Sequence, residues 1–263
     1  MKAILLCAGF ATRMYPLTEN FPKPLLQVAG QPILSDLVAQ LYREGGVKMM
    51  IVVSNARFAD HFRDWAGMEM VKYSDLTLTI LDDSATSNDN RLGAVQDLLF
   101  AVQTQNLVEP VVVAGGDNLF RFPMRDWFDD YAHQPRNLIC VYHEPDQKKL
   151  QRSGVAELAG DQRLLRMIEK PEHPPSHYAC PPLYLLQTEA LQLLPEFIAA
   201  HPHADAPGNF IAWLAARLPV YAHVMAGGRL DIGNLEIYQR AESLLQELEQ
   251  KRLGGVSQTG GIV

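Results

Sequence analysis

The strongest constraint on the fold is an alternation of strand and helix patterns over residues 2–142. Short apolar runs typical of buried strands occur at residues 2–7, 49–53, 76–81, 110–114 and 138–142. Helical patterns separate them, at residues 33–41, 56–66, 92–104 and 124–132. This alternation predicts a parallel, doubly wound sheet that binds its ligands at the carboxyl ends of the strands.

The second half of the chain is less regular. Short strands are expected near residues 155–158, 164–168, 182–187 and 219–225, and helices near 189–200 and 209–217. A final amphipathic helix is expected to present one apolar face, made of Leu235, Tyr238, Ala241, Leu245 and Leu248. Without an internal repeat or a clear linker, the pattern favours one α/β domain over residues 1–253, a doubly wound, Rossmann-like mixed sheet with a small inserted lobe. Residues 254–263, which are rich in glycine, are expected to form a flexible tail.

The charge of the chain excludes one broad class of partner. Its 23 Lys and Arg against 30 Asp and Glu give a formal net charge of −7. Because a nucleic-acid polymer usually needs a basic face, we expect no such polymer as a partner. A single nucleotide needs only a few placed cations and backbone N–H groups, so it is not excluded. No apolar run of 18 residues occurs, so we expect no membrane span and no membrane partner.

The cysteines and the N-terminus indicate a cytoplasmic protein. Cys7, Cys140 and Cys180 are odd in number and widely spaced, which fits a reducing compartment. They form no CxxC pair and therefore give no zinc site. The apolar N-terminal run is soon followed by Arg13 and several prolines, so it is interpreted as a first strand rather than a signal peptide.

The loop after the first strand is suited to phosphate. Ala8, Gly9 and Ala11 are small, which lets backbone N–H groups approach phosphate oxygens. Arg13 offers a planar fork of donors, and Lys23 is mounted stiffly between two prolines. A surface turn with two solvated cations is the alternative, and for Arg13 taken alone it is the favoured one.

Residues 6–26 closely resemble the signature of the sugar-nucleotide pyrophosphorylases, or nucleotidyltransferases, which runs L-A-x-G-x-G-T-R-x-x-P-x-T-x-x-x-P-K-P. Glucose-1-phosphate thymidylyltransferase is the best-known type. In one departure, Ala11 stands in place of the second glycine. The resemblance implies the nucleotide-diphospho-sugar transferase fold, with nucleotide-binding residues Ala8, Gly9, Phe10, Ala11, Thr12 and Arg13. It also implies that Arg13 and Lys23 are catalytic and act on the triphosphate.

Residues 113–120 resemble the family's strand end with the motif G-D-N. A carboxylate just past a strand suits Mg²⁺, although an aspartate there can also form a turn or cap a helix. The resemblance implies that Asp117 is a catalytic metal ligand and that Gly116 contacts the nucleotide. Residues 228–238 resemble the motif W-x-D-I-G-T-x-x-x-Y, which makes Asp231 the second Mg²⁺ ligand. There Arg229 replaces an aromatic residue and Asn234 replaces threonine.

Two further segments resemble the family's acceptor site. Residues 167–171 resemble the motif E-K-P, which implies that Glu169 contacts sugar hydroxyls and Lys170 holds the sugar phosphate. Residues 205–210 resemble the approach from the second lobe and suggest Asn209 as a substrate contact. The nucleotide base is expected at residues 88–94, through Leu92 and Gly93. Arg91 is left with two interpretations, a base contact or a solvated residue at a helix start. Neither the base nor the sugar is fixed by the sequence.

The implied reaction joins a nucleoside triphosphate to a sugar 1-phosphate with release of pyrophosphate, and uses Mg²⁺. A phosphate monoester is already nucleophilic, so in-line attack on the α-phosphorus needs positioning and charge neutralisation rather than a strong base. We expect a nucleotide-binding half over about residues 1–120 and a sugar-phosphate half over about 121–253. Family members often form dimers or tetramers, which leaves room for a homo-oligomer, although the sequence carries no interface signature.

Two alternative functions remain open at this point. A phosphocholine cytidylyltransferase would need an aromatic or acidic box for the quaternary ammonium, for which the candidates are Tyr178, Tyr184, Trp213 and Tyr221. A catalytically silent subunit that binds a nucleotide sugar is supported only by the departures at Ala11 and Arg229. A dehydrogenase that binds a dinucleotide is excluded because the first loop lacks G-x-G-x-x-G.

Overall fold

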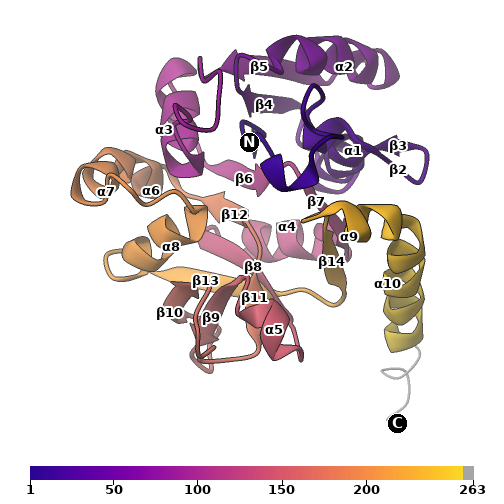
Figure 1. The fold of residues 1–263 in the computed structure, drawn as a ribbon. Coiled ribbons are helices and arrows are strands. Elements are labelled where there is room, and N and C mark those ends of the chain that lie inside the picture. Colours follow the sequence, from indigo (N-terminus) through magenta and orange to yellow (C-terminus); the bar gives the residue numbers. More distant parts are fainter. Residues whose placement is uncertain (257–263) are drawn as a thin grey trace.

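The computed structural model describes the backbone of residues 1–256 and the side chains of residues 1–250. A large mixed sheet with the strand order β10-β9-β11-β8-β12-β6-β1-β4-β5 runs through the molecule, and β13 pairs with β8 (Figure 1). In chain order its strands are β1 (Lys2–Leu6), β4 (Met49–Ser54), β5 (Thr77–Asp82), β6 (Val111–Gly115), β8 (Asn137–His143), β9 (Gly154–Leu158), β10 (Leu164–Glu169), β11 (Tyr178–Cys180), β12 (Leu183–Leu186) and β13 (Val220–Val224). Two small ladders pair β2 (Gln27–Val28) with β3 (Gln31–Pro32), and β7 (Asn118–Arg121) with β14 (Gly228–Asp231).

Helices cover both faces of this sheet. They are α1 (Ile33–Gly45), α2 (Ala59–Lys72), α3 (Ala94–Thr104), α4 (Met124–His133), α5 (Gln147–Leu150), α6 (Thr188–Gln192), α7 (Leu194–Ala200), α8 (Pro207–Ala215), α9 (Leu235–Gln239) and α10 (Ala241–Val256). Two short 3₁₀ turns, Thr12–Met14 and Lys23–Leu25, lie between β1 and β2. Among the described helices, none combines the length and the apolar character that crossing a bilayer requires.

The parallel half of the sheet follows from the apolar runs of the sequence. Strand β1 pairs in parallel with β4 and β6, and β4 pairs in parallel with β5. Ala3 and Leu5 face a core shared with α1, α2 and α4, whereas Ile4 faces a second core shared with α3, α7 and α8. Because both faces are buried, these strands are apolar throughout rather than alternating. The predicted α/β class and mixed sheet are confirmed.

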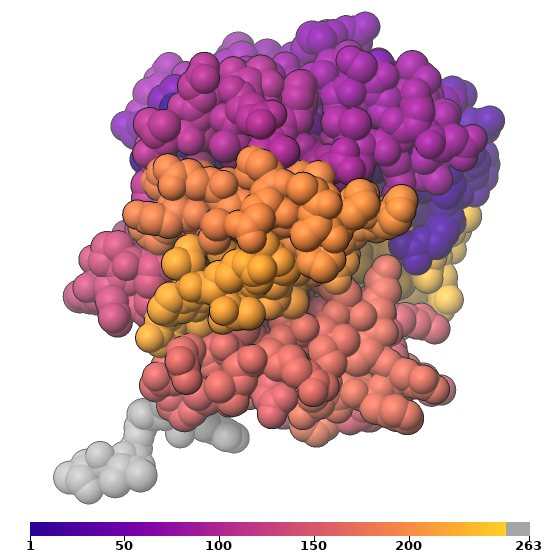
Figure 2. All heavy atoms as spheres, turned by 90° about the vertical axis from the view of Figure 1, so that its left-hand side faces the viewer, coloured from indigo at the N-terminus to yellow at the C-terminus, as the bar shows by residue number. Residues whose placement is uncertain are grey.

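Most strands of the second half enter the same sheet in antiparallel fashion, whereas β13 pairs in parallel with β8. Strand β12 lies antiparallel between β6 and β8, and β11 lies antiparallel between β8 and β9. The β7–β14 ladder then brings residues 228–231 back beside the end of β6, with Asp231 directly opposite Asn118. Figure 2 shows the side that carries α3, where the orange segment near residue 200 lies beneath the magenta segment near residue 100, and α3 contacts both α7 and α8.

Several elements differ in extent from the sequence-based expectation. The helix expected at 56–66 starts later, because the Asn55 side chain accepts from the Phe58 N–H at 3.1 Å and stabilises a turn before α2. At its other end the helix continues to Lys72. The helix expected at 189–200 is broken at Leu193, where Pro195 favours a new helix start. The short strands β2, β3, β7, β11 and β14 and the short helix α5 carry too few residues for a periodic signal and were not predicted.

The final helix is also divided. It breaks at Arg240 into α9 and α10, so the predicted apolar face is only partly continuous. Ala241 and Leu245 are buried, and Tyr238 and Leu248 pack against the same cluster. Helix α10 reaches Val256 and so takes in the first part of the tail expected over 254–263, while 257–263 lie outside the described residues.

Replacing Gly227 tests whether the turn into β14 requires a glycine. Its φ is +148°, and a Cβ built on it would lie 2.1 Å from the carbonyl oxygen of Arg121 in the paired strand. We expect Gly227→Ala to lower the free energy of unfolding by about 1–3 kcal/mol, because backbone must shift to relieve the clash. Urea denaturation followed by circular dichroism measures this. Gly160→Ala is the control, since nothing lies within 4 Å of its added Cβ. Equal stabilities for the two variants would show that the turn is not constrained.

Candidate active site

Two adjoining cavities lie at the carboxyl ends of β1 and β6. The first, of about 270 Å³, lies between the loop that follows β1 and the start of α3. The second, of about 200 Å³, lies between the end of β10, the segment 152–154 and β14. Asp117, Pro182 and Pro207 border both cavities. The position agrees with the prediction that ligands bind at the carboxyl edge of the parallel strands.

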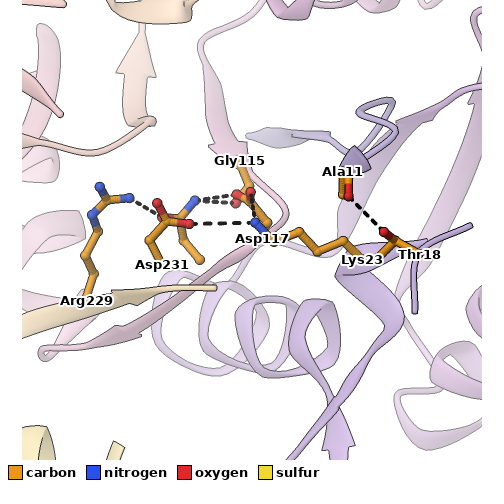
Figure 3. Close-up of polar contacts among 8 residues, drawn as sticks. Ala11, Thr18, Lys23, Gly115, Asp117, Arg229 and Asp231 are labelled. Atoms are coloured by element: carbon orange, nitrogen blue, oxygen red, sulfur yellow. Dashed lines mark hydrogen bonds and ion pairs between the residues drawn. The ribbon is translucent and has the colours of Figure 1, made fainter. Parts of the chain in front are cut away.

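The loop after β1 presents its backbone to the first cavity. Ala8, Gly9 and Ala11 line this cavity. Ala11 adopts a left-handed conformation with φ 47° and ψ 42°, and its carbonyl accepts from the Thr18 hydroxyl at 2.8 Å (Figure 3). The left-handed region favours glycine, so the departure at Ala11 costs about 1–2 kcal/mol but leaves the turn intact.

The other loop residues are placed differently. Phe10 is buried and packs against Phe58, so its side chain belongs to the core and only its backbone faces the loop. Thr12 and Arg13 are exposed on the following 3₁₀ turn, and neither lines either cavity. Within the described residues, the Arg13 side chain makes no hydrogen bond or ion pair. The catalytic role of Arg13 on the triphosphate therefore stays a prediction.

Lys23 is the cation that the structure fixes in place. It is 8% exposed, on the turn that follows Pro22. Its Nζ lies 2.7 Å from Asp117 Oδ2 and 3.7 Å from Asp231 Oδ1 (Figure 3). A buried ammonium is stable only when it is paired and hydrogen-bonded. The two carboxylates thus fix the ammonium next to Asp117, which borders both cavities, although Lys23 itself lines neither.

Sheet register explains how Asp117 and Asp231 meet. Asp117 follows β6 and precedes β7, and the β7–β14 ladder places Asp231 opposite Asn118. The Asn118 amide donates to Asp117 Oδ1 at 2.8 Å. Burial raises the pKa of Asp117, but the Lys23 ammonium and the Arg229 guanidinium outweigh it and hold that pKa below its ordinary value. Asp117 is therefore ionised.

Gly116 serves packing. A Cβ there would lie 2.3 Å from Cys7 Sγ, so glycine permits the end of β6 to approach the end of β1. The neighbouring Gly115 lines the first cavity, whereas Gly116 does not.

The donor set fits Mg²⁺. Over the part of the chain that the structure describes, no group of three or more His, Cys, Asp or Glu side chains is arranged to hold a metal. Mg²⁺ commonly takes one or two protein carboxylates together with substrate phosphates and water. Asp117 and Asp231, which converge on one cation, supply that number of carboxylates.

Glu169 lies at the second cavity, as expected. A Cβ added at Gly208 would lie 1.8 Å from its Oε1 and one at Gly154 would lie 3.1 Å from it, so two glycines make room for this carboxyl. Burial raises the pKa of Glu169, against the opposing effect of Lys170 and Arg229. Two other predicted contacts are not brought to the cavity. Lys170 is exposed with a φ of 49°, and Asn209 lies on the first turn of α8.

The start of α3 is tied to the second half of the chain. Arg91 Nη2 lies 2.6 Å from Asp205 Oδ2, and Asp205 Oδ1 accepts from the Ala94 N–H at 3.0 Å. Neither interpretation of Arg91 described this ion pair. Gly93, with a φ of +97°, lines the first cavity, and a Cβ there would lie 2.8 Å from Asp205 Oδ1. Leu92 is exposed and does not line the cavity.

A buried carboxyl pair beside the first cavity was not predicted. Asp97 lines this cavity from α3, and Asp83 follows β5. One oxygen of each, Asp83 Oδ2 and Asp97 Oδ1, is buried without a donor among the described residues. Burial, reinforced by Asp83, raises the pKa of Asp97 to about 8. The two carboxyls therefore share a proton near neutral pH. An aspartate on the buried face of a predicted helix was the signal that could have revealed it.

The proposed aromatic box does not form. Of its candidates only Tyr184 lines the second cavity. Trp213 packs against Phe197 and Phe210, and Tyr221 lies under the Arg136 guanidinium.

Comparison with known proteins bears on this geometry. The family model described as nucleotidyl transferase matches residues 2–247. The chain belongs to the nucleotidyl transferase family. The nucleotidyl transferase resembles the UTP–glucose-1-phosphate uridylyltransferase AglF of Haloferax volcanii, at 27% identity over 94% of this chain and 97% of that protein. A glucose-1-phosphate thymidylyltransferase of Mycolicibacterium smegmatis is 28% identical over 73% of this chain and 63% of the relative.

Other relatives are longer, and solved structures share the fold. The bifunctional protein GlmU of Methanococcus maripaludis is 26% identical over 75% of this chain, which spans 43% of that protein. A structure assigned as a glucose-1-phosphate thymidylyltransferase from Bacillus anthracis has a TM-score of 0.79 at 23% identity, and covers 93% of this chain and 94% of its own. A UDP-glucose pyrophosphorylase from Acinetobacter baumannii has a TM-score of 0.75 at 18% identity, with 98% and 99% covered. The family resemblance and the enzyme class inferred from the sequence are confirmed.

Asp97 gives this nucleotidyl transferase a predicted pH dependence of stability. Between the ordinary Asp pKa of 3.8 and the raised value of about 8, the folded protein holds a proton that the unfolded chain has lost. This group's contribution to the free energy of unfolding is therefore full below pH 3.8 and falls as the pH rises through the window. We expect Asp97→Asn to lose this fall, so that from pH 5 to pH 8 it gains on the order of a few kcal/mol relative to wild type.

Urea denaturation at the two pH values measures the difference. The exposed Asp89 supplies the control, since Asp89→Asn should keep the wild-type pH dependence. An unchanged pH dependence in Asp97→Asn would contradict proton sharing.

Proposed function

We propose that this protein transfers a nucleotidyl group from a nucleoside triphosphate to a sugar 1-phosphate, with Mg²⁺, and releases pyrophosphate. One observation carries the proposal: Asp117, which borders both cavities, and Asp231, which borders the second, are both paired with the buried Lys23 ammonium behind them. A reaction between two anions needs cations and metal ligands at the point of contact. The activities for which AglF and the thymidylyltransferase are named support the same reaction class.

The triphosphate is assigned to the first cavity. The backbone of Ala8, Gly9 and Ala11 borders it on one side, and Gly93 at the start of α3 borders it on the other. Small residues at both ends allow a phosphate and a planar base to approach the main chain closely. The Arg91–Asp205 ion pair closes one edge, so the nucleotide is held by both halves of the chain.

The acceptor is assigned to the second cavity. Glu169 accepts hydrogen bonds from sugar hydroxyls there, and the absence of side chains at Gly154 and Gly208 leaves room for its carboxyl. Lys170 and Asn209 remain contacts proposed from the sequence, since neither lines the cavity.

The chemistry follows from these positions. An oxygen of the acceptor phosphate attacks the α-phosphorus in line, the bond to the bridging oxygen breaks, and pyrophosphate leaves with that electron pair. Lys23 offsets negative charge at the reacting phosphates, and Arg13 is assigned to the triphosphate and its transition state. Asp117 and Asp231 would hold Mg²⁺, which withdraws charge from phosphate oxygens and orients them. No residue is needed as a strong base, because the phosphate monoester is already nucleophilic.

The protein is placed in the cytoplasm. Cys7, Cys140 and Cys180 are all free and buried, which suits a reducing compartment. Its partners are small molecules, a nucleoside triphosphate and a sugar 1-phosphate, and a homo-oligomer remains compatible with the family.

Pyrophosphate release tests the proposal. CTP, UTP, dTTP, GTP and ATP are each combined with several sugar 1-phosphates in the presence of Mg²⁺. We expect one pair of substrates to react strongly. In Asp117→Asn, kcat should fall by about 100-fold or more, because the variant loses a metal ligand and the partner of Lys23. Asp64→Asn, at an exposed aspartate of α2 that lines neither cavity, is the matched control and should keep wild-type kcat. No turnover in any combination, with nucleotide still bound by calorimetry, would overturn the proposal and leave a silent binding protein.

A further inference from the structure

The proposed reaction gives no role to Arg229, although this residue lines the second cavity. It lies on β14 two residues before Asp231, so both side chains lie on one face of the β7–β14 ladder. Its side chain lines the second cavity together with Arg152, Ser153 and Glu169. Arg229 thus puts a positive charge where the family motif has an aromatic residue.

The contacts of Arg229 are with neutral groups. Its Nη1 donates to Asn118 Oδ1, and its Nε donates to the Tyr142 hydroxyl at 3.5 Å. Within the described residues, no carboxylate oxygen lies within 4.0 Å of its guanidinium. Buried charges are ordinarily paired with an opposite charge. Arg229 therefore has fixed donors and no direct counter-ion.

Other partly buried arginines of the chain show the contrast. Arg121 Nη1 lies 2.8 Å from Asp36 Oδ2, and Arg136 Nη2 lies 2.6 Å from Asp130 Oδ1. Each has a carboxylate in direct contact, as is usual where solvent is largely excluded. In the part of the chain that the structure describes, the Arg229 guanidinium thus has no carboxylate in direct contact, although Asp117, Glu169 and Asp231 line the same cavity, and its donors are open to an anion that enters this cavity.

Asn118 ties this guanidinium to the reaction centre. The same amide accepts from Arg229 and donates to Asp117 Oδ1 at 2.8 Å. An anion bound by Arg229 is therefore held next to the metal-ligand carboxylates, on the acceptor side. Lys170, which the family resemblance assigns to the sugar phosphate, is exposed and does not line this cavity.

We propose that Arg229, oriented by Asn118 and Tyr142, binds the phosphate of the acceptor in place of Lys170. The inference rests on the proposed function, since it takes the second cavity as the acceptor site. A guanidinium can bind phosphate through two parallel N–H···O contacts, which sets both the position and the orientation of the attacking group. Arg229 is thus a substrate-binding residue at which this chain replaces an aromatic contact with a charged one.

Steady-state kinetics of Arg229→Gln and Arg229→Lys test the proposal. We expect Arg229→Gln to raise KM for the sugar 1-phosphate by about 10- to 100-fold while KM for the nucleotide changes less than about twofold. Arg229→Lys keeps the charge but not the fork, so it should recover part of the loss. Arg166→Gln, at an exposed arginine of β10 that lines neither cavity, controls for loss of a positive charge.

Lys170→Gln is the competing variant. If Lys170→Gln raises the acceptor KM and Arg229→Gln does not, the proposal is overturned. It is also overturned if Arg229→Gln lowers kcat with both KM values unchanged, because that result assigns Arg229 to support of Asp117 through Asn118. Circular dichroism confirms that each variant is folded.

A binding measurement separates this inference from the proposed function. By calorimetry, the wild type should bind the sugar 1-phosphate at least about tenfold more tightly than the unphosphorylated sugar, and Arg229→Gln should lose that preference. If wild type turns over and the preference survives in Arg229→Gln, only the inference fails. If wild type never releases pyrophosphate but shows the preference and Arg229→Gln loses it, the anion site stands and the reaction is wrong.

Discussion

The Lys23 ammonium between Asp117 and Asp231 is the interaction on which the site depends. A buried cation of this kind cannot be left alone, so the segments that carry the two carboxylates must stay close to it. Those segments belong to distant parts of the chain, one after β6 and one at the end of β14. Charge pairing thus joins the segment after the first loop to the wall of the second cavity.

The sheet makes that pairing geometrically available. Parallel packing of β1 between β4 and β6 brings the first loop and Asp117 to one edge. The β7–β14 register then determines that Asp231, and not a neighbour, lies opposite Asn118. A slip of one residue would turn Asp231 and Arg229 to the other face of the ladder. The rigid α/β core therefore holds the charged groups. The left-handed Ala11 forms the turn beside the first cavity, and the glycines near Glu169 leave room for its carboxyl in the second.

The sequence predicted those parts of the structure that have local signals. Apolar runs and helical spacing predicted the parallel half, and ordered motifs predicted that Lys23, Asp117, Glu169 and Asp231 belong to one site, where the structure does place them. Contacts between distant segments could not be predicted in this way. The Arg91–Asp205 ion pair depends on which distant loops meet, and a single sequence has no local signal for such a pair. For the Asp83–Asp97 pair, the sequence offered an aspartate on the buried face of a predicted helix but did not identify its partner. Predictions for Lys170 and Asn209 came from short motifs, which fix the order of residues but not the direction of their side chains.

Two of the departures from the family motifs, at Ala11 and Arg229, act on different physical quantities. Ala11 keeps the backbone conformation that glycine would adopt, so that substitution costs conformational energy and leaves the electrostatics of the first cavity unchanged. Arg229 keeps the strand register but adds a positive charge to a cavity that also contains Asp117, Glu169 and Asp231. Since carboxylates repel an incoming phosphate until a cation offsets them, a guanidinium fixed beside Asp117 and Asp231 lowers that repulsion. If the second cavity takes the acceptor, as proposed, the change at Arg229 bears on acceptor binding, whereas the change at Ala11 bears on the stability of the loop.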